Sequence, residues 1–206
     1  MTSENSYRFS QDWFVSNGTE KDWADLEPIK AARTYLEIGS YEGMSTCWMI
    51  ENTAVESLVC IDTWEGGEEH SNSQVDMEAV EERFDHNVSV AGDRVSREID
   101  LTKLKGPSLT KMVEILAKGG SKLFDFVYVD GSHRPKDVLA DAVLGFELLK
   151  PGGIILFDDY CWSDTSTGDG IRSSPKIAVD SFSSCFFDQV WFLKLPLMQV
   201  GFVRRV

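Results

Sequence analysis

The fold of this chain is decided by the stretch Tyr35-Leu36-Glu37-Ile38-Gly39-Ser40-Tyr41-Glu42-Gly43-Met44-Ser45. It begins with a short apolar run, breaks at Gly39, turns through Gly43 and continues into an apolar segment that ends near Ile50. This order predicts a buried strand, a glycine turn and the beginning of a helix. Backbone N–H groups and the positive end of the helix dipole meet at such a turn. It therefore favours a negatively charged or hydroxyl-rich ligand.

The spacing of the acid and the glycines distinguishes between kinds of nucleotide-binding turn. From Glu37 to Gly43 it is E-x-G-x-x-x-G, not the G-x-G-x-x-G of dinucleotide-binding folds. An acid before the first glycine and a looser turn are typical of enzymes that bind S-adenosylmethionine (SAM). An ordinary strand-to-helix connection in an α/β protein has the same pattern, so this stretch alone leaves both interpretations open.

Length and charge limit the kind of protein. The 206 residues are 42% hydrophobic, which is enough for one core, so we expect a single domain. Within it, residues 1–30 are polar with scattered aromatics and are expected to form an N-terminal helical arm or lid on a main domain of residues 31–206. The net charge of −14 repels phosphate backbones, so we expect no nucleic-acid partner.

The chain opens without a signal-peptide pattern and has no apolar run of membrane-spanning length. Its four cysteines form no C-x-x-C pair, which favours reduced thiols. These features predict a cytoplasmic protein with no membrane partner.

Apolar runs alternate with helical spacing along the chain. The runs predict strands at 34–38, 57–62, 97–103, 123–129, 154–157, 190–195 and 200–204. Helices are expected after Gly43, around Met77 to Val88, from Ser108 (as a helix cap) to Gly119, from Pro135 to about Leu149, and from Ile177 to Phe187. The alternation predicts an α/β fold: a Rossmann-like, mostly parallel seven-stranded sheet with an antiparallel C-terminal strand and helices on both faces.

Polar residues follow the strands where ligands of parallel sheets bind, beyond the carboxyl ends. They are Glu37, Asp62, Ser108, Asp130, Asp158 and Asp159. A carboxylate at the position of Asp62 accepts hydrogen bonds from the two hydroxyls of a ribose. A solvated acid at the end of a strand is the simpler interpretation, but the glycine turn one strand earlier favours the ribose.

Three carboxylates are expected to converge at the ends of two neighbouring strands. Asp130, Asp158 and Asp159 would repel one another unless protons or a cation compensated their charge, and carboxylate oxygens suit Mg²⁺. The alternative is that one or two of them cap helices or turns. His133 follows the first of these strands, where it is placed either as a general base or as a structural histidine.

At this point the residues resemble a known family. Residues 36–45 closely resemble the cofactor loop of catechol O-methyltransferase and its relatives. Residues 124–133 and 148–160 resemble the branch of class I SAM-dependent methyltransferases that includes the macrocin-type sugar O-methyltransferases, and the Asp-Thr-Trp run at Asp62 recurs in that branch. The matches cover most of residues 34–160 in the same order.

The resemblance implies roles by position. The residues implied to surround SAM are Glu37, Gly39, Ser40, Tyr41, Gly43 and Ser45 at its methionine part, Asp62 at its ribose, Ser108 and Leu109 at its adenine, and Trp64 and Asp130 nearby. Asp130, Asp158 and Asp159 fall on the metal-ligand positions of the family. His133 stands where the catechol enzymes have a catalytic lysine, so His133 or Asp130 is implied as the base.

The implied activity is divalent-metal-assisted O-methylation of a small molecule: a sugar, a polyol or a catechol-like natural product. The choice of acceptor is expected to rest on the N-terminal arm and on loops 65–76 and 161–172. Tyr160, Trp162 and Arg172 are candidates either to contact the acceptor or to brace their loops. A homodimer through the C-terminal strands is also expected. Three alternatives stay open: a metal-independent methyltransferase acting on another acceptor, a SAM-binding protein without turnover, and a nicotinamide-dependent dehydrogenase, against which the glycine spacing argues.

Overall fold

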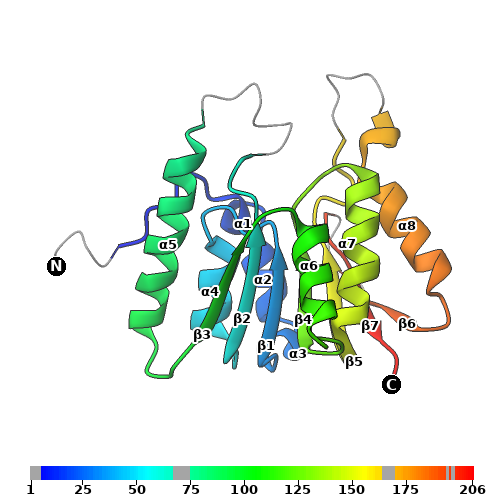
Figure 1. The fold of residues 1–206 in the computed structure, drawn as a ribbon, viewed down its shortest axis with the longest axis horizontal. Helices are drawn as coiled ribbons and strands as arrows, with labels where there is room; N and C mark the ends of the chain where they lie inside the picture. The colour runs from blue at the N-terminus through cyan, green and yellow to red at the C-terminus, as the bar shows by residue number, and fades with distance from the viewer. Residues whose placement is uncertain (1–5, 67–74, 164–169, 194, 196–197) are drawn as a thin grey trace.

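One seven-stranded sheet organises the computed structural model, which describes residues 6–66, 75–163, 170–193, 195 and 198–206 (Figure 1). The strands lie in the order β3-β2-β1-β4-β5-β7-β6. Their bounds are β1 Thr34–Ile38, β2 Ser57–Asp62, β3 Asp100–Lys105, β4 Phe124–Val129, β5 Leu149–Phe157, β6 Val190–Leu193 and β7 Val200–Arg204. Strands β1 to β5 pair in parallel, and β7 is antiparallel to both β5 and β6. The predicted Rossmann-like sheet is confirmed.

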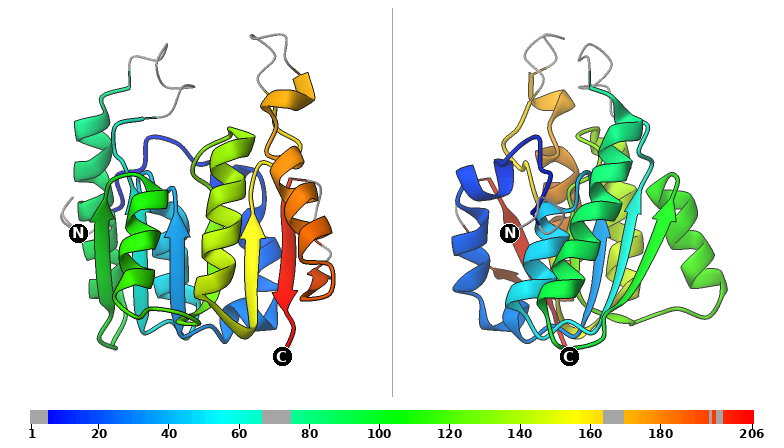
Figure 2. Two further views of the ribbon diagram at one scale, coloured as in Figure 1. Left: turned by 45° about the vertical axis from the view of Figure 1, so that its right-hand side comes forward. Right: turned by 90° about the vertical axis from the view of Figure 1, so that its left-hand side faces the viewer.

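Helices cover both faces of the sheet, as predicted (Figure 2). Their bounds are α1 Trp13–Ser16, α2 Thr19–Ala24, α3 Glu27–Lys30, α4 Met44–Asn52, α5 Met77–Arg94, α6 Ser108–Ala117, α7 Pro135–Leu148 and α8 Lys176–Cys185, with a short 3-10 helix, η3, at Gly170–Ser173. Helices α6, α7 and α8 pack on one face, and α2 to α5 pack on the other. Strand β4 is buried on both faces: Val127 belongs to the α7 side and Phe126 to the α4 side. This explains its continuous apolar run.

Three expectations about boundaries were wrong, each for a local reason. The third strand begins at Asp100 rather than at Arg97, because the Arg97 guanidinium donates to the backbone oxygens of Ile50, Thr53 and Val55 and holds its segment outside the sheet. Strand β5 begins at Leu149, which pairs with Phe124 before a register shift. The strand predicted at 190–195 ends at Leu193, and the next residue lies outside the described residues.

Ser108 does not cap α6, which corrects a further expectation. Pro107 occupies the N-cap position, and the Ser108 hydroxyl donates instead to Asp141 Oδ1 on α7, at 2.6 Å. The side chain thus joins two helices at the edge of the sheet where ligands are expected.

The N-terminal segment, residues 6–30, runs along the α4 and α5 face. Its backbone N–H groups donate to Asn87 (Arg8 N to Oδ1, 2.7 Å) and to Glu42 (Ser10 N to Oε2, 2.6 Å). The indole of Trp23 is fully buried and packs edge-on against Phe126 and Tyr128 of β4. We call residues 6–30 the arm.

Within the described ranges, no helix is both long and apolar enough to cross a membrane. Cys47 and Cys60 are buried, Cys161 and Cys185 are exposed, and all four are free thiols.

Candidate functional site

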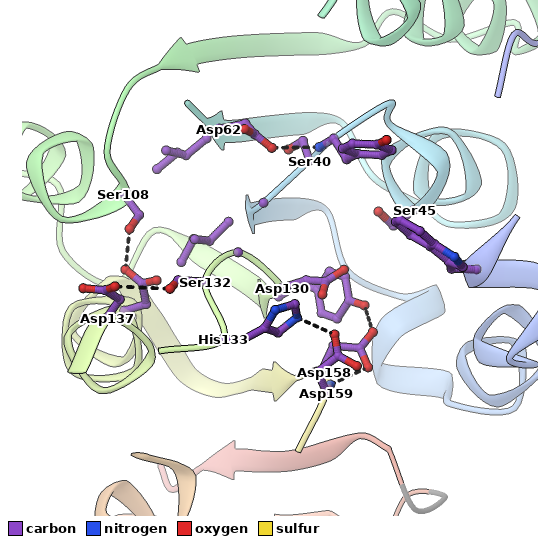
Figure 3. Close-up of a pocket in the computed structure, with 18 of the residues that line it drawn as sticks. Ser40, Ser45, Asp62, Ser108, Asp130, Ser132, His133, Asp137, Asp158 and Asp159 are labelled. Carbon is purple, nitrogen blue, oxygen red and sulfur yellow. Dashed lines mark hydrogen bonds and ion pairs between the residues drawn. The ribbon is translucent and has the colours of Figure 1, made fainter. Parts of the chain in front are cut away.

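A cavity of about 1540 Å³ lies beyond the carboxyl ends of β1, β2, β4 and β5. The expected cofactor residues that line it are Gly39, Ser40, Tyr41, Ser45, Asp62, Ser108, Leu109 and Asp130. Asp158, Asp159 and His133 line the same cavity, so one space joins the expected cofactor residues to the expected catalytic ones (Figure 3). Glu37, Gly43 and Trp64 are not lining residues, and their hydrogen bonds and packing support the turn from outside the cavity.

Gly39 forms the floor of the turn, where no other residue fits. Its φ is +87°, and a Cβ built on it would lie 2.1 Å from the backbone oxygen of Asp130. The end of β1 therefore touches the backbone that follows β4. Gly43, with φ +79°, occupies the N-cap position of α4. Both glycines of the motif are required by backbone conformation.

Glu37 is fully buried beneath the turn. Its carboxylate accepts hydrogen bonds from Tyr35 Oη (2.8 Å), Ser45 Oγ (2.5 Å) and Thr46 Oγ1. Burial raises the pKa of Glu37, and the hydroxyl donors oppose that rise by stabilising the carboxylate. The expected cofactor acid is therefore the support that fixes the first turn of α4. The Ser45 hydroxyl, expected near the SAM carboxylate, uses its hydrogen on Glu37 while lining the cavity.

Asp62 closes the turn from the end of β2. Its Oδ2 accepts from Tyr41 N at 2.8 Å, and its Oδ1 accepts from Trp64 N at 2.7 Å. The Trp64 indole donates to Tyr41 O at 2.9 Å, which completes the link between the two loops. Burial raises the pKa of Asp62, and these backbone donors counter it. A carboxylate oxygen accepts more than one hydrogen bond, so both oxygens retain capacity for a pair of hydroxyls.

Ser108 on α6 and Asp141 on α7 are hydrogen-bonded to each other, and both line the cavity. Burial raises the pKa of Asp141 to about 7, and the hydroxyl of Ser108 opposes that shift. Ser132 donates in the same way to Asp137, at 3.2 Å. These acids of α7 were not singled out from the sequence.

The three carboxylates expected at a metal site all line the cavity. Burial raises the pKa of Asp130 well above its ordinary range, and the charges of Asp158 and Asp159 raise it further. Asp158 accepts from Tyr128 Oη, from Gln199 Nε2 at 3.0 Å and from Asp159 N at 2.8 Å. Three hard oxygen donors fit a divalent cation chemically. However, no three acidic, cysteine or histidine side chains of the described residues are placed to share an ion. The placement of the side chains therefore does not support the expected magnesium site.

His133 lies beside these carboxylates. Its Nε2 is 2.9 Å from Asp159 Oδ2, and its ring stacks on Trp162 with a centroid distance of 4.1 Å and an interplanar angle of 23°. A carboxylate partner and an aromatic neighbour fix the orientation of the imidazole. Trp162 lines the cavity, whereas Tyr160 and Arg172 are absent from its lining. The Tyr160 hydroxyl donates to Asp180 at 2.8 Å. Residues 67–74 and 164–169 of the expected acceptor loops lie outside the described residues.

Gln199 and the arm residue Asp22 line the cavity but were not singled out from the sequence, whereas Trp13, one of the scattered aromatics of residues 1–30, also lines it. Gln199 immediately precedes β7, and Val200 pairs with Phe157 at the end of β5. Because β7 is antiparallel, the residue before it lies at the carboxyl ends of the parallel strands. The antiparallel direction predicted for the last strand could therefore have placed Gln199 near the site. Nothing in the sequence indicated which arm residues reach the cavity.

The glycine turn after β1, the acid at the end of β2 and the histidine and carboxylates beyond β4 and β5 all lie within one stretch of sequence that matches a known family. Residues 36–160 match the family model described as "Methyltransferase domain", so the chain belongs to this family of methyltransferases.

Solved structures share the fold. An O-methyltransferase from Bacillus cereus in complex with S-adenosylhomocysteine (SAH) is 18% identical, with a TM-score of 0.64, and the match covers 95% of this chain and 84% of that one. TomG from Streptomyces achromogenes, an O-methyltransferase involved in tomaymycin synthesis and solved with SAM, is 19% identical, with a TM-score of 0.58 and coverage of 90% and 79%.

Among curated proteins, "Uncharacterized protein R132" of Acanthamoeba polyphaga mimivirus is 27% identical over 149 residues. The match covers 71% of this chain and 56% of that protein, so the chain spans little more than half the length of this relative.

Proposed function

We propose that this chain transfers the methyl group of SAM to a hydroxyl of a small molecule. The observation that carries the proposal is the single cavity that joins the glycine turn and Asp62 to His133, Asp159 and Trp162. The similarity in fold to O-methyltransferases solved with SAM or SAH supports the choice of cofactor and of hydroxyl acceptor.

The cofactor side of the cavity fits SAM by charge and hydrogen bonding. The ribose hydroxyls donate to Asp62, whose two oxygens are already held in place by Tyr41 N and Trp64 N. The turn at Gly39 packs directly on the backbone at Asp130, since any side chain at Gly39 would collide with it, and this contact brings the turn next to the carboxylates beyond β4. Ser108 and Leu109 lie on the wall after β3, where the adenine is expected.

The transfer itself is an in-line displacement at the methyl carbon. The new C–O bond forms as the C–S bond breaks, and the bonding electron pair stays on sulfur to give SAH. The hydroxyl proton passes to the imidazole of His133, and Asp159, 2.9 Å from Nε2, stabilises the resulting imidazolium. The protein contributes by aligning the oxygen with the methyl carbon. Asp130 would be the alternative proton acceptor if a bound cation kept its carboxylate ionised, because burial and the neighbouring charges raise its pKa and favour the protonated form.

A divalent cation remains part of the proposal on the chemistry of its donors alone, because the side chains of the described residues, as placed, do not share an ion. Asp130, Asp158 and Asp159 would hold it, and when bound it would orient the acceptor hydroxyl and lower the hydroxyl pKa. The support is the chemistry of the three donors and the mutual repulsion of their charges. The acceptor proposed on the same ground is a sugar, polyol or catechol, because two adjacent oxygens chelate a cation well.

Calorimetric titration with SAH tests the cofactor part. We expect the wild type and the exposed-site control Asp93→Ala to bind SAH alike, and Asp62→Ala to bind at least 10-fold more weakly, since a hydrogen bond to a charged group contributes about 1.5–3 kcal/mol. A second titration with Mg²⁺ on the SAH complex tests the cation, with Asp158→Ala as the variant expected to lose the signal. A wild type that does not bind SAH would refute the proposed function.

A further inference from the structure

The carboxylate of Asp158 is connected to the N-terminal arm by a buried chain of hydrogen bonds. The indole Nε1 of Trp23 donates to Gln199 Oε1 at 3.0 Å, and Gln199 Nε2 donates to Asp158 Oδ2 at 3.0 Å. Trp23 is fully buried and Gln199 is 5% exposed, so the bond between them is shielded from water, whereas the partly buried Asp158 lies at the cavity wall. The chain of bonds joins helix α2, the residue before β7 and the end of β5.

The direction of every bond in this chain is determined by chemistry. An indole N–H is a donor only, so the amide oxygen of Gln199 must face Trp23 and its NH₂ group must face Asp158. The reversed amide would place its NH₂ against the indole N–H and its oxygen against a carboxylate. Tyr128 Oη, which also donates to Asp158 Oδ2, lies 3.4 Å from the same amide nitrogen.

The two ends of the chain are held by packing. The Trp23 ring makes edge contacts with Phe14, Trp48, Phe126 and Tyr128, with centroid distances between 4.8 and 5.7 Å. On the other side, Tyr160 N donates to Met198 O at 2.9 Å, which ties the backbone beside Gln199 to the loop after Asp158. The indole cannot rotate without breaking this packing, and the backbone that carries Gln199 is held at Met198.

We propose that Gln199 is a positioning residue. It fixes the rotamer of the Asp158 carboxylate at the catalytic centre, and Trp23 fixes Gln199, so the docked arm and the catalytic carboxylate are coupled. The inference rests on the proposed function for the catalytic importance of Asp158. The coupling itself depends only on the three side chains. It gives the arm a part in the reaction without any contact between Trp23 and the substrate.

The test follows the indole N–H signal of Trp23 by NMR in protein labelled with ¹⁵N-tryptophan. The chain has six tryptophans. Trp23→Phe, which keeps a ring and removes the N–H, identifies the signal, and Trp191, 60% exposed on the edge strand β6, is the internal control. Asp158→Asn removes the charge at the far end of the chain with almost no change in shape. It is made in the wild type and in Gln199→Met, which keeps the length of the side chain but forms no such bonds.

Three results are expected from the coupling. Asp158→Asn shifts the Trp23 signal but not the Trp191 signal. Gln199→Met shifts the Trp23 signal in the direction of a lost hydrogen bond. In the Gln199→Met protein, Asp158→Asn causes no further shift of the Trp23 signal. Gln189→Met, at an exposed glutamine, leaves both signals unchanged. If Gln199→Met fails to fold, Gln199→Glu replaces it, because its carboxylate still accepts from the indole but cannot donate to Asp158.

The inference is overturned if Asp158→Asn leaves the Trp23 signal in place, or if it shifts the signal equally with and without the Gln199 amide. SAH titrations on the same samples separate the two proposals. A wild type that shows the coupling but does not bind SAH refutes the proposed function alone, and one that binds SAH without the coupling refutes the positioning role alone.

Discussion

Replacing Gly39 by alanine tests how closely the glycine turn after β1 packs against the segment that follows β4. Gly39 has φ +87°, and an added Cβ would lie 2.1 Å from Asp130 O, 2.5 Å from Asp130 C and 2.5 Å from Gly131 Cα. All three are backbone atoms, so no flexible side chain can move aside. The end of β1 and the segment after β4 must separate instead.

Two costs add for Gly39→Ala. A left-handed backbone costs a residue with a Cβ about 1–2 kcal/mol relative to glycine. Forcing extra volume into a filled space costs about 1–3 kcal/mol more. We therefore expect Gly39→Ala to lower the free energy of unfolding by about 2–5 kcal/mol, a large part of the 5–15 kcal/mol typical of a domain, and to abolish SAH binding.

Gly18→Ala is the matched control, because Gly18 has φ +79° with no heavy atom within 4 Å of its added Cβ. It should show only the first cost, about 1–2 kcal/mol, and bind SAH normally. Urea unfolding followed by tryptophan fluorescence measures both variants. Equal losses of stability in the two variants, or wild-type SAH affinity in Gly39→Ala, would refute the reasoning.

Three other predictions concern the surroundings of the site. The pKa of Asp141 is raised to about 7 from an unfolded value near 3.9, so its protonated form stabilises the fold below pH 4 and this contribution is lost as the pH rises through 7. Between pH 5 and 8, the free energy of unfolding of the wild type, measured in urea, should fall by roughly 2–3 kcal/mol relative to that of Asp141→Asn. Parallel pH profiles of the two proteins would contradict this. Glu42 is 2% exposed and accepts hydrogen bonds from Ser10 N, Ser10 Oγ and Arg83 Nε, so it holds the arm in place. Glu42→Gln should therefore accelerate tryptic cleavage in the arm, and an unchanged digestion pattern would contradict this. Removing divalent ions with EDTA should slow methyl transfer and added Mg²⁺ should restore it, whereas full activity after chelation would exclude the cation from the proposal.

The sequence predicted the sheet because each strand had its own unambiguous signal. Continuous apolar runs marked the buried strands, and Gly39 and Gly43 stood where positive φ angles occur. Boundaries were less predictable wherever a side chain far along the chain decided them. Arg97 binds three backbone oxygens around the end of α4, and no local pattern near residue 97 encodes those partners.

The residues of the candidate site likewise divide into those that the sequence could predict and those that it could not. Residues at the ends of parallel strands, such as Asp62 and Asp158, were predictable because topology alone brings strand ends together. Trp23 and Gln199 were not, because 176 residues separate them and their contact depends on how the arm folds back over α4. Glu37 stays a prediction as a cofactor residue; its buried carboxylate accepts hydrogen bonds from three hydroxyls that shape the turn, and no local pattern indicated these partners.

The most direct test of the central claim is transfer of a labelled methyl group. Purified protein is incubated with methyl-labelled SAM and, separately, with sugars, polyols and catechols that carry adjacent hydroxyls, and label in the acceptor is measured. We expect transfer to the oxygen of at least one such compound. We also expect at least a 100-fold lower rate in His133→Gln with SAH affinity unchanged, since general base catalysis contributes about 10²–10⁴-fold. A protein that binds SAM but labels no hydroxyl compound, or a His133→Gln variant as fast as the wild type, would contradict it.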